Sequence, residues 1–139
     1  MLDHLYFWCG GYFGTNKLIT IKYQDGYLTL DSYLFLRENR TKTFPHFHAK
    51  WTRERSKRWL PRIEEIHYEL WEDEYWANVC DGEQWKLRYQ YEGESEREIF
   101  GSNSYPENWN QFRNLMTTLA QKLPRVEDIE IKEILKLFC

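Results

Sequence analysis

Residues 85–91 alternate strictly between apolar and polar side chains, and this pattern constrains the fold more than any other segment. One side of an extended chain carries Trp85, Leu87, Tyr89 and Tyr91, and the other carries Lys86, Arg88 and Gln90. Successive side chains of a strand point to opposite faces of a sheet, so this segment predicts an antiparallel strand with one buried face. A turn over residues 92–95 and a short return strand over residues 97–100 follow.

A hairpin is predicted near the N-terminus. Residues 17–23 alternate in the same way, and residues 27–30 are also typical of a strand. Asp25-Gly26 stands between them and favours a type I′ turn, which needs positive φ at both central residues. Further extended segments are expected at residues 5–8, 67–71 and 75–80, and an irregular connection is expected over residues 37–48.

Two helices are predicted from apolar side chains spaced three or four residues apart. The first covers residues 49–66, with Pro61 ending or kinking it. The second begins at a capping box formed by Ser104 and Glu107 and ends before Pro124. Its apolar stripe consists of Trp109, Phe112, Met116, Leu119 and Leu123. The tail could form a strand from Ile129, but we predict a short helix there instead.

The chain of 139 residues corresponds to a single domain, residues 1–139. Runs of strands separated by single helices are typical of α+β proteins. We therefore predict an antiparallel β-sheet of about five to six strands, with two main helices packed on one face and a short C-terminal helix.

Cysteine usage and the N-terminal segment indicate the compartment. Cys9, Cys80 and Cys139 are widely spaced and form no CxxC pair, as expected for free thiols in a reducing environment. Residues 2–13 are interrupted by Asp3, His4 and a glycine pair, so they are too polar for a signal sequence or a membrane span. We expect a soluble cytoplasmic protein without membrane contact.

Two segments resemble a known family. Residues 81–87, DGEQWKL, and residues 101–109, GSNSYPENW, are similar to a bacterial family of uncharacterised proteins with a DGxxWxL strand and a GxNxYPxNWxxF helix start. Phe112 fills the last position, and the resemblance covers roughly residues 63–123. The family has no established activity, so the resemblance implies a fold and a bacterial or phage origin but no chemistry.

No catalytic constellation is apparent, and no catalytic residue is assigned. The sequence lacks GxSxG, GxGxxG and Walker-type loops, so an enzyme is not expected. His46-x-His48 brings two imidazoles together, and Cys80 or His67 could complete a metal site. The paired spacings of zinc sites are missing, however, so we expect neither a metal nor a cofactor.

Protein binding is the favoured function. Basic residues concentrate in residues 1–62 and acidic residues in residues 63–139, and acidic and aromatic side chains adjoin each other after residue 70. Aromatic side chains dominate interface energetics. We expect a small non-catalytic protein that binds another protein, of the toxin-neutralising or phage-encoded inhibitor type, as a monomer or homodimer. The expected contact residues are Trp71, Glu72, Asp73, Glu74, Tyr75 and Trp76.

Two alternatives remain open. The basic helix over residues 50–62 could bind nucleic acid, with Trp51 and Trp59 as stacking aromatics. Its charged contacts would be Arg53, Lys57, Arg58 and Arg62. The protein could instead bind a small ligand, or act as an enzyme, near Asn103, Tyr105 and Asn108, because a helix N-terminus favours an anion. The same residues are also typical of a turn and a helix start, which is a purely structural role.

Overall fold

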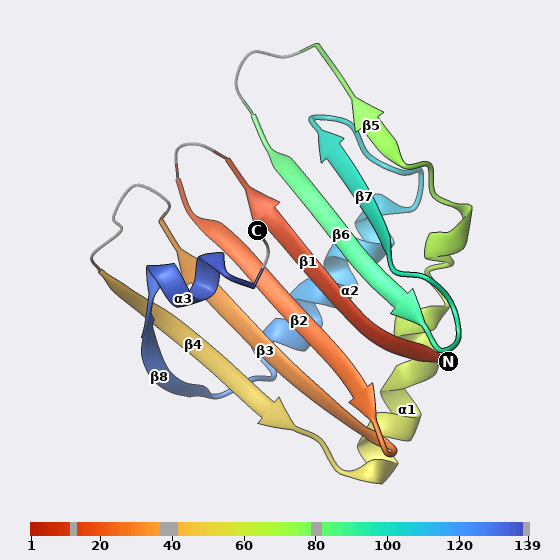
Figure 1. Ribbon diagram of the computed structural model, residues 1–139, viewed down its shortest axis with the longest axis vertical. Coiled ribbons are helices and arrows are strands. Elements are labelled where there is room, and N and C mark those ends of the chain that lie inside the picture. The colour runs from red at the N-terminus through yellow and green to blue at the C-terminus, as the bar shows by residue number, and fades with distance from the viewer. Residues whose placement is uncertain (12–13, 37–41, 79–81, 138–139) are drawn as a thin grey trace.

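A computed structural model describes residues 1–11, 14–36, 42–78 and 82–137. In this part of the chain, eight strands form one sheet in the order β5-β7-β6-β1-β2-β3-β4-β8. The strands are β1 (Leu2–Gly10), β2 (Asn16–Gln24), β3 (Tyr27–Phe35), β4 (Thr43–Lys50), β5 (Glu74–Trp76), β6 (Gln84–Tyr91), β7 (Arg97–Ser102) and β8 (Arg125–Glu130). Helices α1 (Arg53–Glu64) and α2 (Trp109–Gln121) lie behind the sheet in Figure 1, and α3 (Ile131–Leu135) lies in front.

The prediction of five to six antiparallel strands is wrong. The sheet has eight strands and is mixed, because β5 pairs in parallel with β7 while every other neighbouring pair is antiparallel. Residues 43–48 of the expected connection belong to β4, which pairs with β3 and β8, and residues 37–41 lie outside the described residues. Pro45 is tolerated there because it pairs only with Asp128 of the edge strand β8, whereas the pairing of β4 with β3 begins at His46.

The N-terminal hairpin is confirmed. Strands β2 and β3 pair from Asn16–Phe35 to Gln24–Tyr27, and Asp25 and Gly26 both have positive φ, 54° and 88°. Strand β6 is also confirmed, and it lies between β1 and β7. Both segments were recognisable because their turn residues and their alternation are local properties of the chain.

The first helix is shorter than predicted and Pro61 does not end it. Residues 43–50 are used by β4, and the N–H of Trp51 donates to the carbonyl of Leu28, so helix α1 starts only after Thr52. The Thr52 hydroxyl caps it by accepting from the N–H of Arg55. The extended segment expected at residues 67–71 is instead the 3₁₀ turn η1 (Tyr68–Leu70), which follows a left-handed residue, His67.

The predicted capping box does not form. Helix α2 begins at Trp109 with Asn108 in the cap position, and the carbonyl of Ser104 accepts from the indole N–H of Trp85. Its apolar stripe is confirmed, since Trp109, Phe112, Met116, Leu119 and the following Leu123 are all buried. The preferred short helix of the tail is found as α3, whereas the strand there, β8, lies earlier than the alternative considered from Ile129, because it ends at Glu130.

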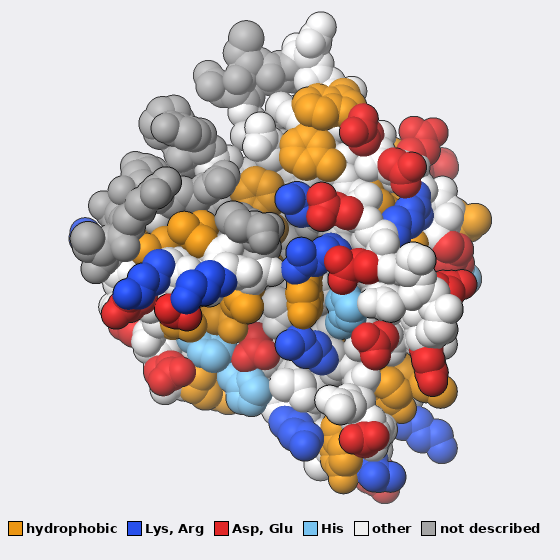
Figure 2. Space-filling model, viewed as in Figure 1, with side chains coloured by type: hydrophobic (Ala, Val, Ile, Leu, Met, Phe, Trp, Pro, Cys, Tyr) orange, Lys and Arg blue, Asp and Glu red, His pale blue; other side chains and the backbone are white. Residues whose placement is uncertain are grey.

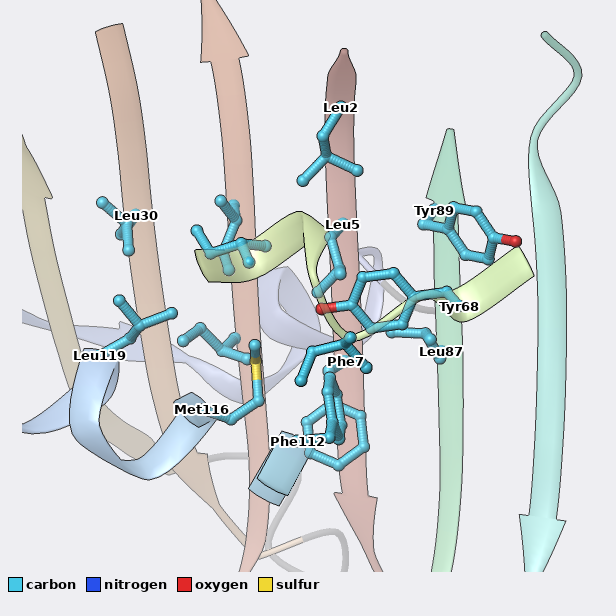
Figure 3. Close-up of a cluster of buried hydrophobic side chains, with 14 of the residues drawn as sticks. Leu2, Leu5, Phe7, Leu30, Tyr68, Leu87, Tyr89, Phe112, Met116 and Leu119 are labelled. Atoms are coloured by element: carbon cyan, nitrogen blue, oxygen red, sulfur yellow. The ribbon is translucent and has the colours of Figure 1, made fainter. Parts of the chain in front are cut away.

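The main core lies between the sheet and the two rear helices. In Figure 3, Leu5 and Phe7 of β1 and Leu87 of β6 face Tyr68 and Phe112. A smaller apolar cluster on the front face packs α3 against the sheet; it comprises Trp8, Leu18, Tyr33, Phe35, Ile131 and Ile134. None of the described helices has the length and apolar character needed to cross a membrane.

The two segments that carry the family resemblance interlock. Gly101 pairs with Trp85, and a Cβ at Gly101 would lie 2.0 Å from the indole nitrogen of Trp85. A Cβ at Gly82 would lie 1.7 Å from the side-chain oxygen of Asn103, which adopts a left-handed φ of 54°. Each glycine therefore makes room for a side chain of the other segment, so these residues form a structural unit.

Candidate functional site: a cavity between α2 and the sheet

A partly open cavity of about 430 Å³ lies between α2 and the rear face of the sheet. Its walls are mostly apolar. The sheet contributes Phe7, Ile19, Leu34 and Phe47, and the helix contributes Met116 and Ala120. This volume falls within the range of small-molecule sites, which are typically apolar with a few polar groups.

The cavity exists because the facing side chains at this end are too small or too polar to fill the space. Ser32 on β3 and Thr117 and Ala120 on α2 are short, whereas Lys17 on β2 is long but directed by its charge to solvent. At the other end of α2, aromatic rings occupy the equivalent space. Trp109, the first residue of α2, belongs to this aromatic group and also lines the cavity.

Glu83 is a fixed acidic group on the cavity wall. The hydroxyl of Tyr105 donates to its Oε1 at 3.2 Å. Its backbone exchanges two hydrogen bonds with Asn103, because the N–H of Glu83 donates to Oδ1 at 3.0 Å and its carbonyl accepts from the N–H of Asn103 at 2.9 Å. Glu83 is thereby held by two of the residues predicted from the helix-start segment.

The Cys9 thiol lies beside this carboxylate. Burial, the hydrogen bond to Glu83 and the charge of Glu83 raise the pKa of Cys9 to about 12. Burial and the same negative charge raise the pKa of Tyr105 to about 12. At neutral pH both groups therefore keep their protons, and a protonated thiol is a poor nucleophile.

Two cations also line the cavity. Lys17 comes from β2 and Arg113 from α2, and both side chains remain exposed. Neither forms an ion pair with any residue that the structure describes. Two unpaired cations beside an apolar wall favour a ligand that combines an apolar body with an anionic group.

No known protein-family model matches this chain, and no curated protein matches it. The functional interpretation therefore depends on the geometry of the cavity and of the other predicted sites.

The predicted ligand-binding residues divide into two groups. Asn103 and Tyr105 reach the cavity through Glu83. Asn108 does not, because its Oδ1 accepts from the indole of Trp71 at 2.9 Å and its Nδ2 donates to the carbonyl of Ile66 at 2.9 Å. Asn108 thus connects η1 and α2 inside the fold.

The predicted protein-binding residues are also divided. Trp71 is buried, and Tyr75 packs on Trp85 with 5.8 Å between ring centroids. Asp73 is paired with Arg97 at 3.0 Å. The remaining exposed set consists of Glu72, Glu74 and Trp76. Figure 2 shows hydrophobic side chains next to acidic ones at this β5–β7 edge.

Trp76 is the most exposed aromatic side chain of this group. It is 63% exposed, and its ring lies 5.1 Å from that of Phe100. Strand β5 ends the sheet, so its outer backbone groups have no neighbouring strand among the described residues. An open edge beside an exposed tryptophan is suited to pairing with another chain.

Helix α1, the predicted basic helix, carries exposed positive charges, but the tryptophan rings of this segment are not free to stack on bases. Trp51 and Trp59 are buried, and the guanidinium groups of Arg55 and Arg62 cover their rings at 4.1 Å and 4.7 Å. Arg53 stacks on Tyr27 at 4.9 Å. Lys57 and Arg58 are simply exposed. The stacking expected for single-stranded nucleic acid therefore has no platform on α1.

Sequence reasoning missed the four titratable residues of the cavity wall: Cys9, Lys17, Glu83 and Arg113. Glu83 belongs to the DGEQWKL segment, so its proximity to Tyr105 could have been inferred from a pairing of β6 with β7. The other three come from separate elements, and no local pattern connects them. His46 and His48 also gained a partner that was not predicted, Asp31, whereas Cys80 lies outside the described residues and His67 contacts Glu69.

Proposed function

We propose that this protein binds a small amphipathic organic acid in the cavity between α2 and the sheet, in the cytoplasm. The observation that carries the proposal is the combination of an apolar cavity of about 430 Å³ with two cations at its wall, Lys17 and Arg113, which form no ion pair with any residue in the described part of the chain. Apolar burial supplies most of the affinity of such sites, and a charge-assisted hydrogen bond orients the ligand.

The proposed pose places the apolar chain of the ligand between Ile19 and Phe47 on one side and Met116 on the other. Its carboxylate lies at the solvent-facing side, within reach of Arg113 and Lys17. Glu83 keeps its own partners, Tyr105 and Cys9, and so remains a repulsive group that orients the ligand carboxylate away from it.

The proposal is binding rather than catalysis. Cys9 lines the cavity, and the raised pKa of its thiol disfavours the reactive thiolate. Ser32 is buried in the same wall, and the described residues around it offer no imidazole as a general base.

The test uses decanoate, with 1-decanol as the uncharged comparison, in calorimetric titrations. Decanoate should bind with one site per chain and more tightly than decanol. Replacing Lys17 and Arg113 together by Gln should weaken decanoate binding by about 100-fold or more, since each of the two lost charged hydrogen bonds contributes about 1.5–3 kcal/mol. The decanol titration should stay unchanged.

A steric variant separates the cavity from the rest of the surface. Thr117→Trp places an indole into the cavity, whereas Thr118→Trp adds the same ring to the exposed face of α2, away from the cavity lining. Only the first should abolish binding. If both variants bind decanoate like the wild type, or if the wild type does not bind it, the proposal is wrong.

Protein binding through the β5 edge is a second candidate function, in keeping with an inhibitor-type role. The observation that favours it is the exposed Trp76 beside the unpaired edge of β5, with the acidic Glu72 and Glu74 next to it. A partner would add a strand to β5 and present basic side chains to the two glutamates.

This candidate can be tested by quantitative affinity capture with matched variants. Trp76→Ser should remove any specific partner, whereas Val126→Ser should not, because Val126 is a similarly exposed apolar residue, at 51%, on the opposite edge strand β8. A partner that both variants retain equally would exclude the β5 edge as its binding site.

A further inference from the structure

We propose that Asp31, His46 and His48 form a binding site for a divalent transition-metal ion, with zinc(II) as the expected ion. The site lies on the front face of the sheet, opposite the cavity and independent of it. Histidine side chains gather next to an acidic one over β3 and β4 in Figure 2.

Strand geometry brings the three side chains together. His46 and His48 are two residues apart on β4, so both imidazoles project from the same face. Asp31 on β3 is the direct cross-strand partner of His48. The three groups thus come from two neighbouring central strands, which is a rigid support for a metal site.

The ligand atoms converge on one point. Asp31 Oδ1 lies 2.8 Å from His46 Nε2 and 2.8 Å from His48 Nδ1, and all three atoms lie within 4.8 Å of one another. Tetrahedral zinc with ligands at about 2.0–2.1 Å separates those ligands by about 3.4 Å. An opening of about 0.6 Å between the carboxylate and the rings would therefore admit the ion.

The second nitrogen of His46 supports a metal rather than a hydrogen bond alone. Nδ1 of His46 is buried and has no hydrogen-bond partner among the described residues, and Glu127 Oε1 lies 3.8 Å away. When a metal occupies Nε2, the ring proton resides on Nδ1, where it can be donated to Glu127. Metal-bound histidines commonly donate their other nitrogen to a carboxylate in this way.

The surroundings fix the ring and attract a cation. Tyr33 stacks on His46 with 4.5 Å between centroids and an angle of 11°. The carboxylates of Asp31 and Glu127 lie 2.8 Å and 3.8 Å from the two ring nitrogens of His46, so negative charge flanks the site on both sides of this ring.

Three protein ligands leave a fourth coordination position. The side chain of His48 is 40% exposed, so this position faces solvent and can hold water or a small anion. Two imidazoles and one carboxylate suit zinc and the neighbouring divalent metals, whereas calcium and magnesium prefer oxygen ligands.

His4 provides a matched contrast on the same face. It contacts two carboxylates, with Nδ1 2.9 Å from Asp3 and Nε2 2.6 Å from Glu96. Because these contacts use the two nitrogens on opposite sides of the ring, the groups do not converge on one point. His4 should therefore not bind the ion.

The experiment measures zinc(II) binding by calorimetry and cobalt(II) binding by visible absorption at neutral pH. We expect one ion per wild-type chain, with cobalt bands of a low-coordinate nitrogen and oxygen site. His48→Gln and Asp31→Asn should abolish saturable binding, and Glu127→Gln should weaken it by about 10–100-fold, as for other partners of metal ligands. His4→Gln should bind like the wild type.

A second measurement uses the unmodified protein and so does not depend on the folding of any variant. Histidine ring resonances, followed by ¹⁵N NMR during zinc addition, should shift for His46 and His48 and stay in place for His4 and His67. The absence of saturable binding by the wild type would overturn the proposal. So would shifts confined to His4 or His67, or unchanged affinity in both His48→Gln and Asp31→Asn.

Discussion

The two halves of α2 rest on the same sheet but meet it in different ways. The first half is closed by aromatic rings, with 4.6 Å between the centroids of Trp85 and Trp109 and 4.8 Å between those of Phe7 and Phe112. The second half, from Met116 onward, borders the cavity, as do Trp109 and Arg113 of the first half. A single amphipathic helix thus serves as a core element at one end and as the lid of a cavity at the other.

The difference shows that large side chains on one helix can stabilise the fold while short side chains on the same helix leave space for a ligand. Well-packed aromatic clusters contribute most to the free energy of folding, because each ring buries a large apolar area. Short side chains leave space that water or a ligand can occupy. We therefore expect substitutions of the buried rings in the first half to change mainly stability, and substitutions of cavity-lining side chains, Arg113 included, to change mainly binding.

The largest expected effect is that of removing a ring from the closed half. Trp85→Ala should lower the free energy of unfolding by about 3–5 kcal/mol, because Trp85 is fully buried and contacts Trp71 and Trp109. Trp109→Ala should have an effect of similar size. Denaturant unfolding measures both, and Trp76→Ala is the control because its ring is exposed. Equal losses for Trp76→Ala and Trp85→Ala would contradict this distinction.

The second-largest loss of stability is expected from disturbing the contact between Gly101 and Trp85. Gly101→Ala should destabilise the fold by about 3 kcal/mol, because the new methyl group would lie 2.0 Å from the indole nitrogen and force the ring to move. The double variant with Trp85→Phe tests the cause. If the clash is responsible, the two substitutions will be less than additive in denaturant unfolding. Full additivity would show that the ring is not what Gly101 accommodates.

Local patterns predicted the elements that depend on local rules. The hairpin at Asp25-Gly26, strand β6 and the stripe of α2 all follow from turn chemistry or side-chain period. Strand β4 was missed because Pro45 and two histidines hide its alternation, and it is identified only by its neighbours β3 and β8. The parallel pairing of β5 with β7 is likewise a contact between distant segments, so no single segment of the sequence predicts it.

The same distinction applies to the sites. Tyr105 and Asn103 could be predicted because they belong to one segment, but the cavity also needs Cys9, Lys17 and Arg113 from three separate elements. The register between neighbouring strands decides whether these side chains lie close together, and no local sequence pattern specifies that register. The acidic and aromatic segment after residue 70 showed the reverse problem, since burial places Trp71 in the core although its neighbours in sequence are exposed.

A side chain of the open half should have a smaller effect on stability than one of the closed half. Met116→Ala should cost about 2 kcal/mol, at the low end for such a truncation, because it enlarges a space that already communicates with solvent. Phe112→Ala, only one turn earlier, should cost about 3–5 kcal/mol, because that ring is fully buried among Phe7, Tyr68 and Trp71. Equal losses in thermal unfolding would remove the contrast between the two halves.

The smallest expected effect concerns the thiol at the end of the cavity. In a background with Cys80→Ser and Cys139→Ser, Cys9 should react slowly with a thiol reagent at pH 8, because its pKa is raised to about 12. Burial and the charge of Glu83 both raise this pKa, and Glu83→Gln removes the charge. The reaction should therefore become faster while the fold is retained.

The same pKa fixes the sign of a pH dependence. The folded-state pKa of Cys9 lies above its ordinary value of 9.0, so its contribution to stability is fully present below about pH 9 and is lost as the pH rises toward 12. Cys9→Ala should therefore lose less thermal stability than the parent between pH 9 and 11, with little difference at pH 7. An identical alkaline decline in both proteins would mean that the thiol is not held protonated by Glu83 and the cavity wall.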